Sequence, residues 1–251
     1  MQIITTPAKV AGSFLVVSAV LVTINCALLF LYYYLGGHEL FGLLDLFDLD
    51  IEGNIPTLYS AVAVLFCAAL LGLVTVINWH KPDSRRLYWL GLSILFLFLA
   101  IDEGAAIHEE IGSWLDNHYD ARGVLYFFWV VPYGMAASIL ALIYLRFLGT
   151  LPADTRWRFI LAGALYVGGA LGVEMLGARE ADLHNTNTLV YSFLFTLEET
   201  LEMLGIVIFM HALLLYLVHE TGRLEVVLNL GTVGPSRDHT DDEGRRSAPP
   251  P

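Results

Sequence analysis

Residues 87–110 read LYWLGLSILFLFLAIDEGAAIHEE, an apolar run that ends among Asp102, Glu103, Glu109 and Glu110. A helix needs about 20 predominantly apolar residues to cross the hydrocarbon core of a bilayer. Charged groups inside that core are costly, so acids in a membrane helix usually face the interior of a bundle and serve a function. This stretch therefore predicts a membrane helix with a functional site at one end.

The rest of the chain repeats the apolar pattern. Of its 251 residues, 57% are hydrophobic and 15% charged, and the apolar ones fall in long runs. We predict an all-α, polytopic integral membrane protein, a six-helix transmembrane bundle formed by residues 1–220. Residues 221–251 are predicted to be a disordered cytoplasmic tail. The expected spans are about 10–35, 56–79, 87–109, 124–148, 159–177 and 189–218.

Basic residues are distributed unevenly around these spans. If the N-terminus is cytoplasmic, 11 of the 13 Lys and Arg lie on the inner side, and only Arg122 and Arg179 lie outside. The positive-inside rule then predicts that both termini are cytoplasmic. The outer loops and outer helix halves hold 17 of the 25 acids, so the net charge of −12 offers no basic surface to nucleic acid. Membrane lipids are the expected partners, and the oligomeric state is left open.

Three of the predicted helices carry acids at one depth. With a rise of about 1.5 Å per residue, Asp102, Glu174 and Glu202 each lie roughly 21–22 Å from the cytoplasmic end of their helix. Glu199 lies one turn above Glu202, on the same face. We therefore predict that acids from three helices line one cavity in the outer half of the bundle.

Crowded carboxylates in a low dielectric must share protons, pair with cations or bind metal. Because basic partners are scarce and His108 stands beside the acids, we predict a divalent metal ion, with Fe, Zn or Mn favoured. A metal-free proton or cation site and a purely structural hydrogen-bond network remain open. The predicted catalytic residues are Glu103, His108 and Glu199. The predicted metal ligands are Asp102, Glu103, His108, Glu109, Glu174, Glu199 and Glu202.

The first outer loop alternates leucine and phenylalanine with acids, which favours a short amphipathic helix on the surface. Residues 48–53 match the first half of a calcium-binding loop, but Tyr59 stands where that loop needs a bidentate acid. Asn54 and Pro56 instead predict the start of the next helix.

Two spans carry residues that affect helix geometry. Pro132 falls inside the predicted span 124–148 and predicts a kink there. Gly168, Gly169 and Gly172 give the span 159–177 a face of small residues, which predicts close approach of a neighbouring helix.

Three motifs together resemble a known group of proteins. EGNIPTLYS at residues 52–60, LAIDEGAAIHEE at 99–110 and EETLEMLG at 198–205 are similar to motifs of a family of bacterial multi-pass membrane proteins without an assigned function. The resemblance covers about residues 50–215 and implies location in the bacterial cell (inner) membrane. It implies no chemistry, but it suggests that the three motifs form one site.

Three classes of function fit these features. The first is a metal-dependent membrane enzyme acting on a lipid or a lipid-soluble substrate. The second is proton or cation translocation through the acids. It is disfavoured because the inner helix halves are nearly free of polar groups apart from His211 and Asn78. The third is a non-catalytic membrane sensor or assembly protein.

Overall fold

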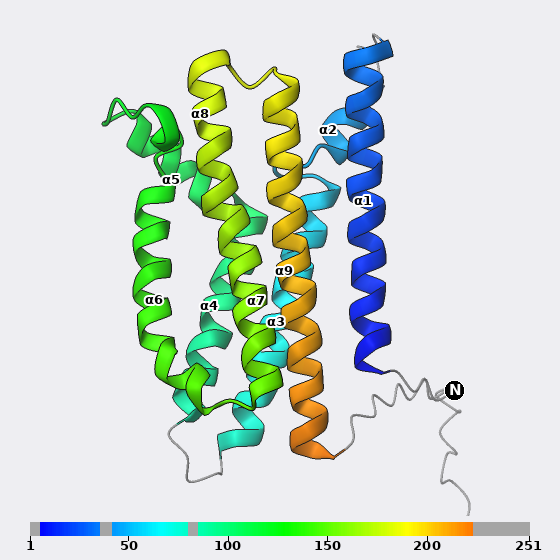
Figure 1. The fold of residues 1–251 in the computed structure, drawn as a ribbon, viewed down its shortest axis with the longest axis vertical. Helices are drawn as coiled ribbons and strands as arrows, with labels where there is room; N and C mark the ends of the chain where they lie inside the picture. Colours follow the sequence, from blue (N-terminus) through cyan, green and yellow to red (C-terminus); the bar gives the residue numbers. More distant parts are fainter. Residues whose placement is uncertain (1–5, 36–41, 80–84, 223–251) are drawn as a thin grey trace, which may run out of the picture. The chain divides into compact units, whose positions relative to one another are not determined.

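The structure, a computed structural model, describes residues 6–35, 42–79 and 85–222, and all regular structure in these ranges is helical (Figure 1). The elements in order are α1 (Pro7–Leu35), α2 (Leu43–Phe47), α3 (Ile55–Trp79), α4 (Arg85–Ala105), α5 (Ile107–Asp116), η1 (Gly123–Leu125), α6 (Val130–Thr150), α7 (Ala153–Val167), η2 (Gly168–Val173), α8 (Glu174–His184) and α9 (Leu189–Thr221). Six segments of the described chain are long and apolar enough to cross a membrane. These are α1, α3, α4, α6, the continuous run α7–η2–α8, and α9.

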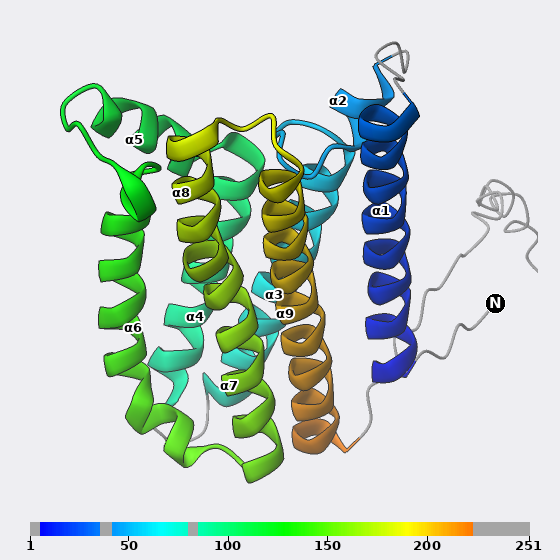
Figure 2. The ribbon, with the colours of Figure 1, turned by 45° about the horizontal axis from the view of Figure 1, so that its top comes forward.

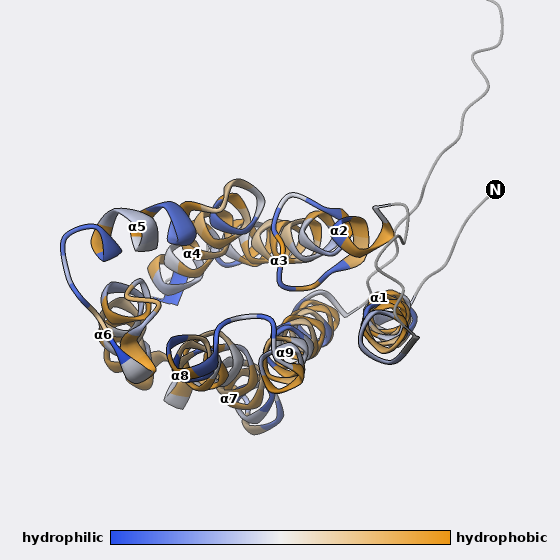
Figure 3. Cartoon of the chain, turned by 90° about the horizontal axis from the view of Figure 1, so that it is seen from above, coloured by the Kyte–Doolittle hydropathy of each residue, from blue (hydrophilic) through white to orange (hydrophobic). Residues whose placement is uncertain are grey.

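The six long segments form two rows. Seen along the bundle, α3 and α4 lie on one side, and α6, α7–α8 and α9 lie on the other (Figure 3). α3 packs against α4, α7 packs against α9, and α1 lies along α9. The start of α1 and the end of α9 lie at the same end of the bundle, whereas α2, α5 and α8 lie at the opposite end (Figures 1 and 2).

Aromatic side chains pack together in the half of the bundle that contains the start of α1 and the end of α9. The Trp89 ring packs 4.9 Å from the rings of both Phe147 and Tyr216, measured between centroids. All three side chains are buried in a cluster that also contains Leu71 and Leu213. Acidic residues therefore gather at one end of the bundle, and a packed apolar core fills the other.

The prediction of one continuous helix over 87–109 was wrong. α4 ends at Ala105, and α5 begins at Ile107 after Ala106, whose φ of 52° lies in the left-handed region. That conformation is uncommon for a residue with a Cβ atom. Glu109 falls in the first turn of α5, where an acid favours a helix start. Asp102 and Glu109 therefore do not share one helix face.

The predicted kink at Pro132 was also wrong. α6 begins at Val130, so Pro132 lies in its first turn, where the missing N–H disrupts no helical hydrogen bond. The carbonyl oxygen of Phe128 accepts a hydrogen bond from the Val131 amide at 3.1 Å. The proline begins this helix and does not bend it.

Other local predictions are confirmed. α2 is the short helix expected in the loop between the first two spans, and Asn54 caps α3 by accepting a hydrogen bond from the Thr57 amide at 3.2 Å. Gly169 allows close helix approach, because a Cβ atom there would lie 2.8 Å from the Glu198 carbonyl oxygen. Gly172 has no such neighbour within 4 Å. The predicted tail lies outside the described residues, apart from Thr221 and Gly222.

Candidate functional site

A cavity of about 1290 Å³ lies between α4, α6, α7 and α9 and reaches the loop before α3. All seven residues predicted to bind metal line it, and no Lys or Arg does so in the part of the chain that the structure describes. Its charge is therefore strongly acidic, with His108 as the one described basic side chain. The acids in its lining are Asp50, Glu52, Asp102, Glu103, Glu109, Asp116, Glu174, Glu198, Glu199 and Glu202.

His108 bridges two carboxyl groups. Its Nδ1 atom lies 3.4 Å from Oδ2 of Asp102, and its Nε2 atom lies 3.2 Å from Oε1 of Glu52. Burial lowers the pKa of His108. The hydrogen bond to Asp102 and the nearby acid charges more than offset this effect and raise the pKa to about 9. Without a metal, the ring is therefore an imidazolium at neutral pH.

Three side chains offer ligand atoms close enough to hold one metal ion. Atoms of Glu52, His108 and Glu109 all lie within 4.8 Å of one another. Oε2 of Glu52 is buried and has no hydrogen-bond partner among the residues that the structure describes. Burial raises the pKa of Glu52 to about 7, partly opposed by the charge of His108. A cation at this point would provide the partner that the buried oxygen lacks.

Asp102 lies on the Nδ1 side of the His108 ring. Its Oδ1 accepts a hydrogen bond from the Tyr133 hydroxyl at 2.8 Å, while Oδ2 faces His108. The Trp129 ring covers the imidazole, with centroids 4.8 Å apart. Metal-binding histidines commonly donate a hydrogen bond from the N–H of their second ring nitrogen to a carboxylate. This bond fixes the ring orientation and the tautomer.

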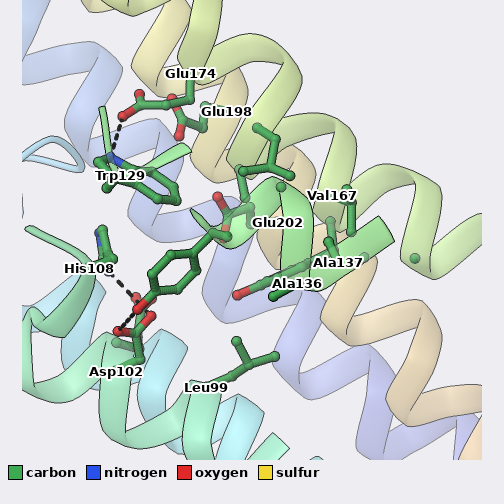
Figure 4. Close-up of a pocket in the computed structure, with 18 of the residues that line it drawn as sticks. Leu99, Asp102, His108, Trp129, Ala136, Ala137, Val167, Glu174, Glu198 and Glu202 are labelled. Atoms are coloured by element: carbon green, nitrogen blue, oxygen red, sulfur yellow. Dashed lines mark hydrogen bonds and ion pairs between the residues drawn. The ribbon is translucent and has the colours of Figure 1, made fainter. Parts of the chain in front are cut away.

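Glu174 and Glu198 face each other across from His108. The Trp129 indole donates a hydrogen bond to Oε1 of Glu174 at 3.1 Å, and the Glu174 and Glu198 carboxyl groups are in hydrogen-bonding contact. Figure 4 shows His108 and Asp102 on one side of the cavity and these two acids on the other. Two carboxyl groups can hydrogen-bond only when one of them carries a proton.

A second group of acidic side chains lines another part of the cavity. Glu103 on α4 and Glu199 and Glu202 on α9 are near enough for their charges to interact, and the Tyr166 hydroxyl hydrogen-bonds to Glu202. These three acids, with Asp102 and Glu174, lie outside the group of atoms within 4.8 Å of one another. Their roles as metal ligands or proton carriers remain predictions.

The sequence interpretation missed several residues of the site. Glu52 was not among the predicted ligands, although it is the first residue of EGNIPTLYS, one of the three motifs suggested to form one site. Asp50 was also missed. Its Oδ1 accepts a hydrogen bond from the Tyr191 hydroxyl at 2.9 Å, and burial raises its pKa to about 7. No pattern in the sequence pointed to Trp129 or Tyr133, which reach the site only through the packing of α6.

The family model described as "Domain of unknown function (DUF8692)" matches residues 14–217. The chain belongs to this family, and the matched range includes every acid that lines the cavity. A search of curated proteins and a search of solved structures found no match.

Proposed function

We propose that this is a multi-pass membrane protein with a divalent metal centre at Glu52, His108 and Glu109. We further propose that it is a metal-dependent enzyme acting on a lipid or a lipid-soluble substrate. The observation that carries this proposal is the convergence of three ligand atoms within 4.8 Å, beside a buried Glu52 oxygen without a partner. The three ligands come from two different segments, the loop before α3 and the first turn of α5.

The surface of the long helices supports a membrane location. Large apolar side chains such as Leu142, Val76 and Phe193 are 69%, 65% and 64% exposed. Apolar surface on this scale is unusual for a protein surrounded by water and is typical of one surrounded by lipid. We propose that both termini are cytoplasmic, because 11 of the 13 basic residues would then lie inside. The location in the bacterial inner membrane is proposed from the resemblance of the three sequence motifs.

The donor set suits a catalytic metal. One imidazole and two carboxylates leave coordination positions for water and substrate, as catalytic zinc sites do. The same donors are compatible with Mn and Fe. A divalent cation would also offset several of the acid charges, which have no Lys or Arg beside them among the described lining residues.

When bound, the metal would lower the pKa of a coordinated water and polarise an oxygen of the substrate. Side chains of the protein would position the metal ligand, transfer protons and exclude water. Asp102 would hold the His108 ring so that Nε2 faces the ion. Glu103 and Glu199, whose charges interact within the same cavity, would accept and return protons. Trp129 and Tyr133 would cover the imidazole and limit access of bulk water.

One observation favours a second candidate, a proton or cation relay. The contact between Glu174 and Glu198 requires a shared proton, as a relay would. A relay across the membrane also needs polar or titratable side chains in the other half of the bundle. In that half, Trp89, Phe147 and Tyr216 pack into an apolar core. We therefore rank the relay second.

Elemental analysis of protein purified without chelator tests the proposal. We expect stoichiometric Fe, Zn or Mn in the wild type and a sharp loss of metal in Glu52→Gln, His108→Gln and Glu109→Gln. Glu110→Gln is the matched control, because Glu110 is exposed, adjacent in sequence and outside the cavity lining. The absence of stoichiometric metal in the wild type would reject the metal centre and leave the relay as the leading function.

A further inference from the structure

The cavity continues beyond the carboxylates as an apolar space. Leu95 and Leu99 line it from α4, Ala137 and Leu140 line it from α6, and Val167 lines it from α7. These side chains of α4 and α6 therefore face the cavity and do not pack directly against each other. In Figure 4, Ala137 and Val167 lie to the right of Glu202, and Leu99 lies at the bottom of the view.

Two hydrogen bonds join α4 and α6 along this space. Near the acids, the Tyr133 hydroxyl donates to Asp102 at 2.8 Å. Farther along α6, the Tyr144 hydroxyl donates to the Tyr88 carbonyl at 3.0 Å, and the cavity lining continues one turn beyond it, to Phe147 and Leu148. The two tyrosines are eleven positions apart on α6, a length of about 16 Å. This is close to half of the roughly 30 Å hydrocarbon core, the depth of one lipid leaflet.

The acidic charge of the cavity lining limits which polar groups a bound molecule can carry. The described lining contains ten acids and no Lys or Arg, so a phosphate or carboxylate head would meet like charge without a basic partner. A head that donates hydrogen bonds would instead match the acceptor oxygens of the acids. Trp129 and Tyr133 offer both kinds of contact. Their rings are apolar, and their polar tips donate hydrogen bonds to Glu174 and Asp102.

We propose that the cavity binds a single-chain amphiphile whose head donates hydrogen bonds and carries no negative charge, such as a long-chain alcohol, amide or amine. The chain would lie between α4 and α6, and the head would lie among the carboxylates. That this molecule is the substrate rests on the proposed function, whereas its binding rests on the shape and charge of the cavity alone.

Thermal unfolding of the full chain in phosphatidylcholine nanodiscs tests the binding. The probes are dodecanol, dodecylamine, dodecanoate and dodecyl phosphate, which share one chain and differ in the head. We expect dodecanol and dodecylamine to raise the Tm saturably, by roughly 5 °C at about 100 times the Kd. We expect no saturable shift from the two anionic probes.

Two variants of α6 separate cavity binding from partition into the bilayer. Ala137→Phe fills the apolar space, and the Tm shifts should disappear. Ile139→Phe places the same ring on an exposed position outside the cavity lining, and the shifts should persist. Equal shifts from the anionic probes, or unchanged shifts in Ala137→Phe, would overturn the proposal.

The same measurement on Glu52→Gln distinguishes this inference from the metal centre. Retained dodecanol and dodecylamine shifts in this variant would support amphiphile binding even if the wild type contains no metal. Bound metal in the wild type without any probe-dependent shift would support the metal centre and reject the amphiphile.

Discussion

Nδ1 of His108 lies 3.4 Å from Oδ2 of Asp102, on the side of the ring opposite Glu52. This relationship determines which ring nitrogen can reach a metal, because a nitrogen that donates to a carboxylate is not free to act as a ligand. Nε2 is thereby directed toward Glu52 and Glu109, the two carboxyl groups that complete the candidate metal centre. We therefore propose that Asp102 acts by positioning His108, whereas the sequence alone predicts Asp102 as a metal ligand.

The first prediction concerns Asp102→Asn, which keeps the size of the side chain but removes the charge that orients His108. We expect metal affinity to fall by roughly 10- to 100-fold, the usual effect of changing a residue that orients a ligand. Competition against a chelator of known affinity measures the change. Tyr133→Phe removes only the hydrogen bond to the other Asp102 oxygen and should weaken binding less. Unchanged affinity in Asp102→Asn would contradict the positioning role.

The second prediction is that metal-free protein loses stability as pH rises from 5 to 9. The folded-state pKa of Glu52 is raised from 4.5 to about 7, that of Asp50 from 3.8 to about 7, and that of His108 from 6.5 to about 9. Each raised pKa contributes stability that is fully present below the unfolded value and is lost as pH rises through the folded value. The Tm of chelator-treated protein should therefore fall over this range.

Metal should reverse this trend, because its ligands bind in their deprotonated forms and its affinity rises with pH. The difference in Tm between metal-loaded and metal-free protein should therefore widen from pH 5 to pH 9. The control is Glu52→Gln, which removes one of the three titrating groups and should flatten the metal-free profile. A metal-free Tm that rises with pH would show that the groups titrate in the opposite sense.

Helix number and approximate depth could be predicted from the sequence because both depend on the length of apolar runs. Asp102, Glu174 and Glu202 reach one cavity because the rise per residue is the same in every helix. Ala106 could not be predicted as a helix break. It is an ordinary helix-forming residue, and nothing in the local sequence indicates the left-handed conformation that it adopts between α4 and α5.

The partners of His108 were unpredictable for a related reason. Glu52 lies 56 positions earlier in the chain and approaches the ring only after the loop before α3 folds over the end of α4. Helical periodicity relates residues three or four positions apart and carries no information about such a contact. The Glu52, His108 and Glu109 group therefore required the structure.

The third prediction concerns topology. We expect Asn117, exposed at the end of α5, to lie outside the cytoplasm and Ser236 to lie inside, because of the 11-to-2 division of basic residues. Single cysteines at these positions, in a chain with Cys26 and Cys67 changed to serine, can be labelled by an impermeant thiol reagent in intact cells. Labelling of Asn117→Cys from the cytoplasmic side would reverse the proposed orientation.

The fourth prediction concerns the contact that holds Glu202 in the cavity. At Gly205, a Cβ atom would lie 2.8 Å from the Ala162 carbonyl oxygen and 2.9 Å from the Tyr166 amide nitrogen, both backbone atoms of α7. Gly205→Ala must therefore push α9 away from α7, with a cost on the order of 1–3 kcal/mol. The same displacement would separate Tyr166 from Glu202, which lines the cavity, so probe binding should weaken together with stability.

Gly163→Ala is the matched control for this prediction, because a Cβ atom there meets nothing within 4 Å and the position lies within helix α7. Alanine in an open helical position is favoured over glycine by up to about 1 kcal/mol, so this variant should unfold at the same or a higher temperature. Thermal unfolding of both variants in nanodiscs gives the comparison. If Gly205→Ala is as stable as Gly163→Ala, then α7 and α9 are not held at the distance that places Glu202 in the cavity.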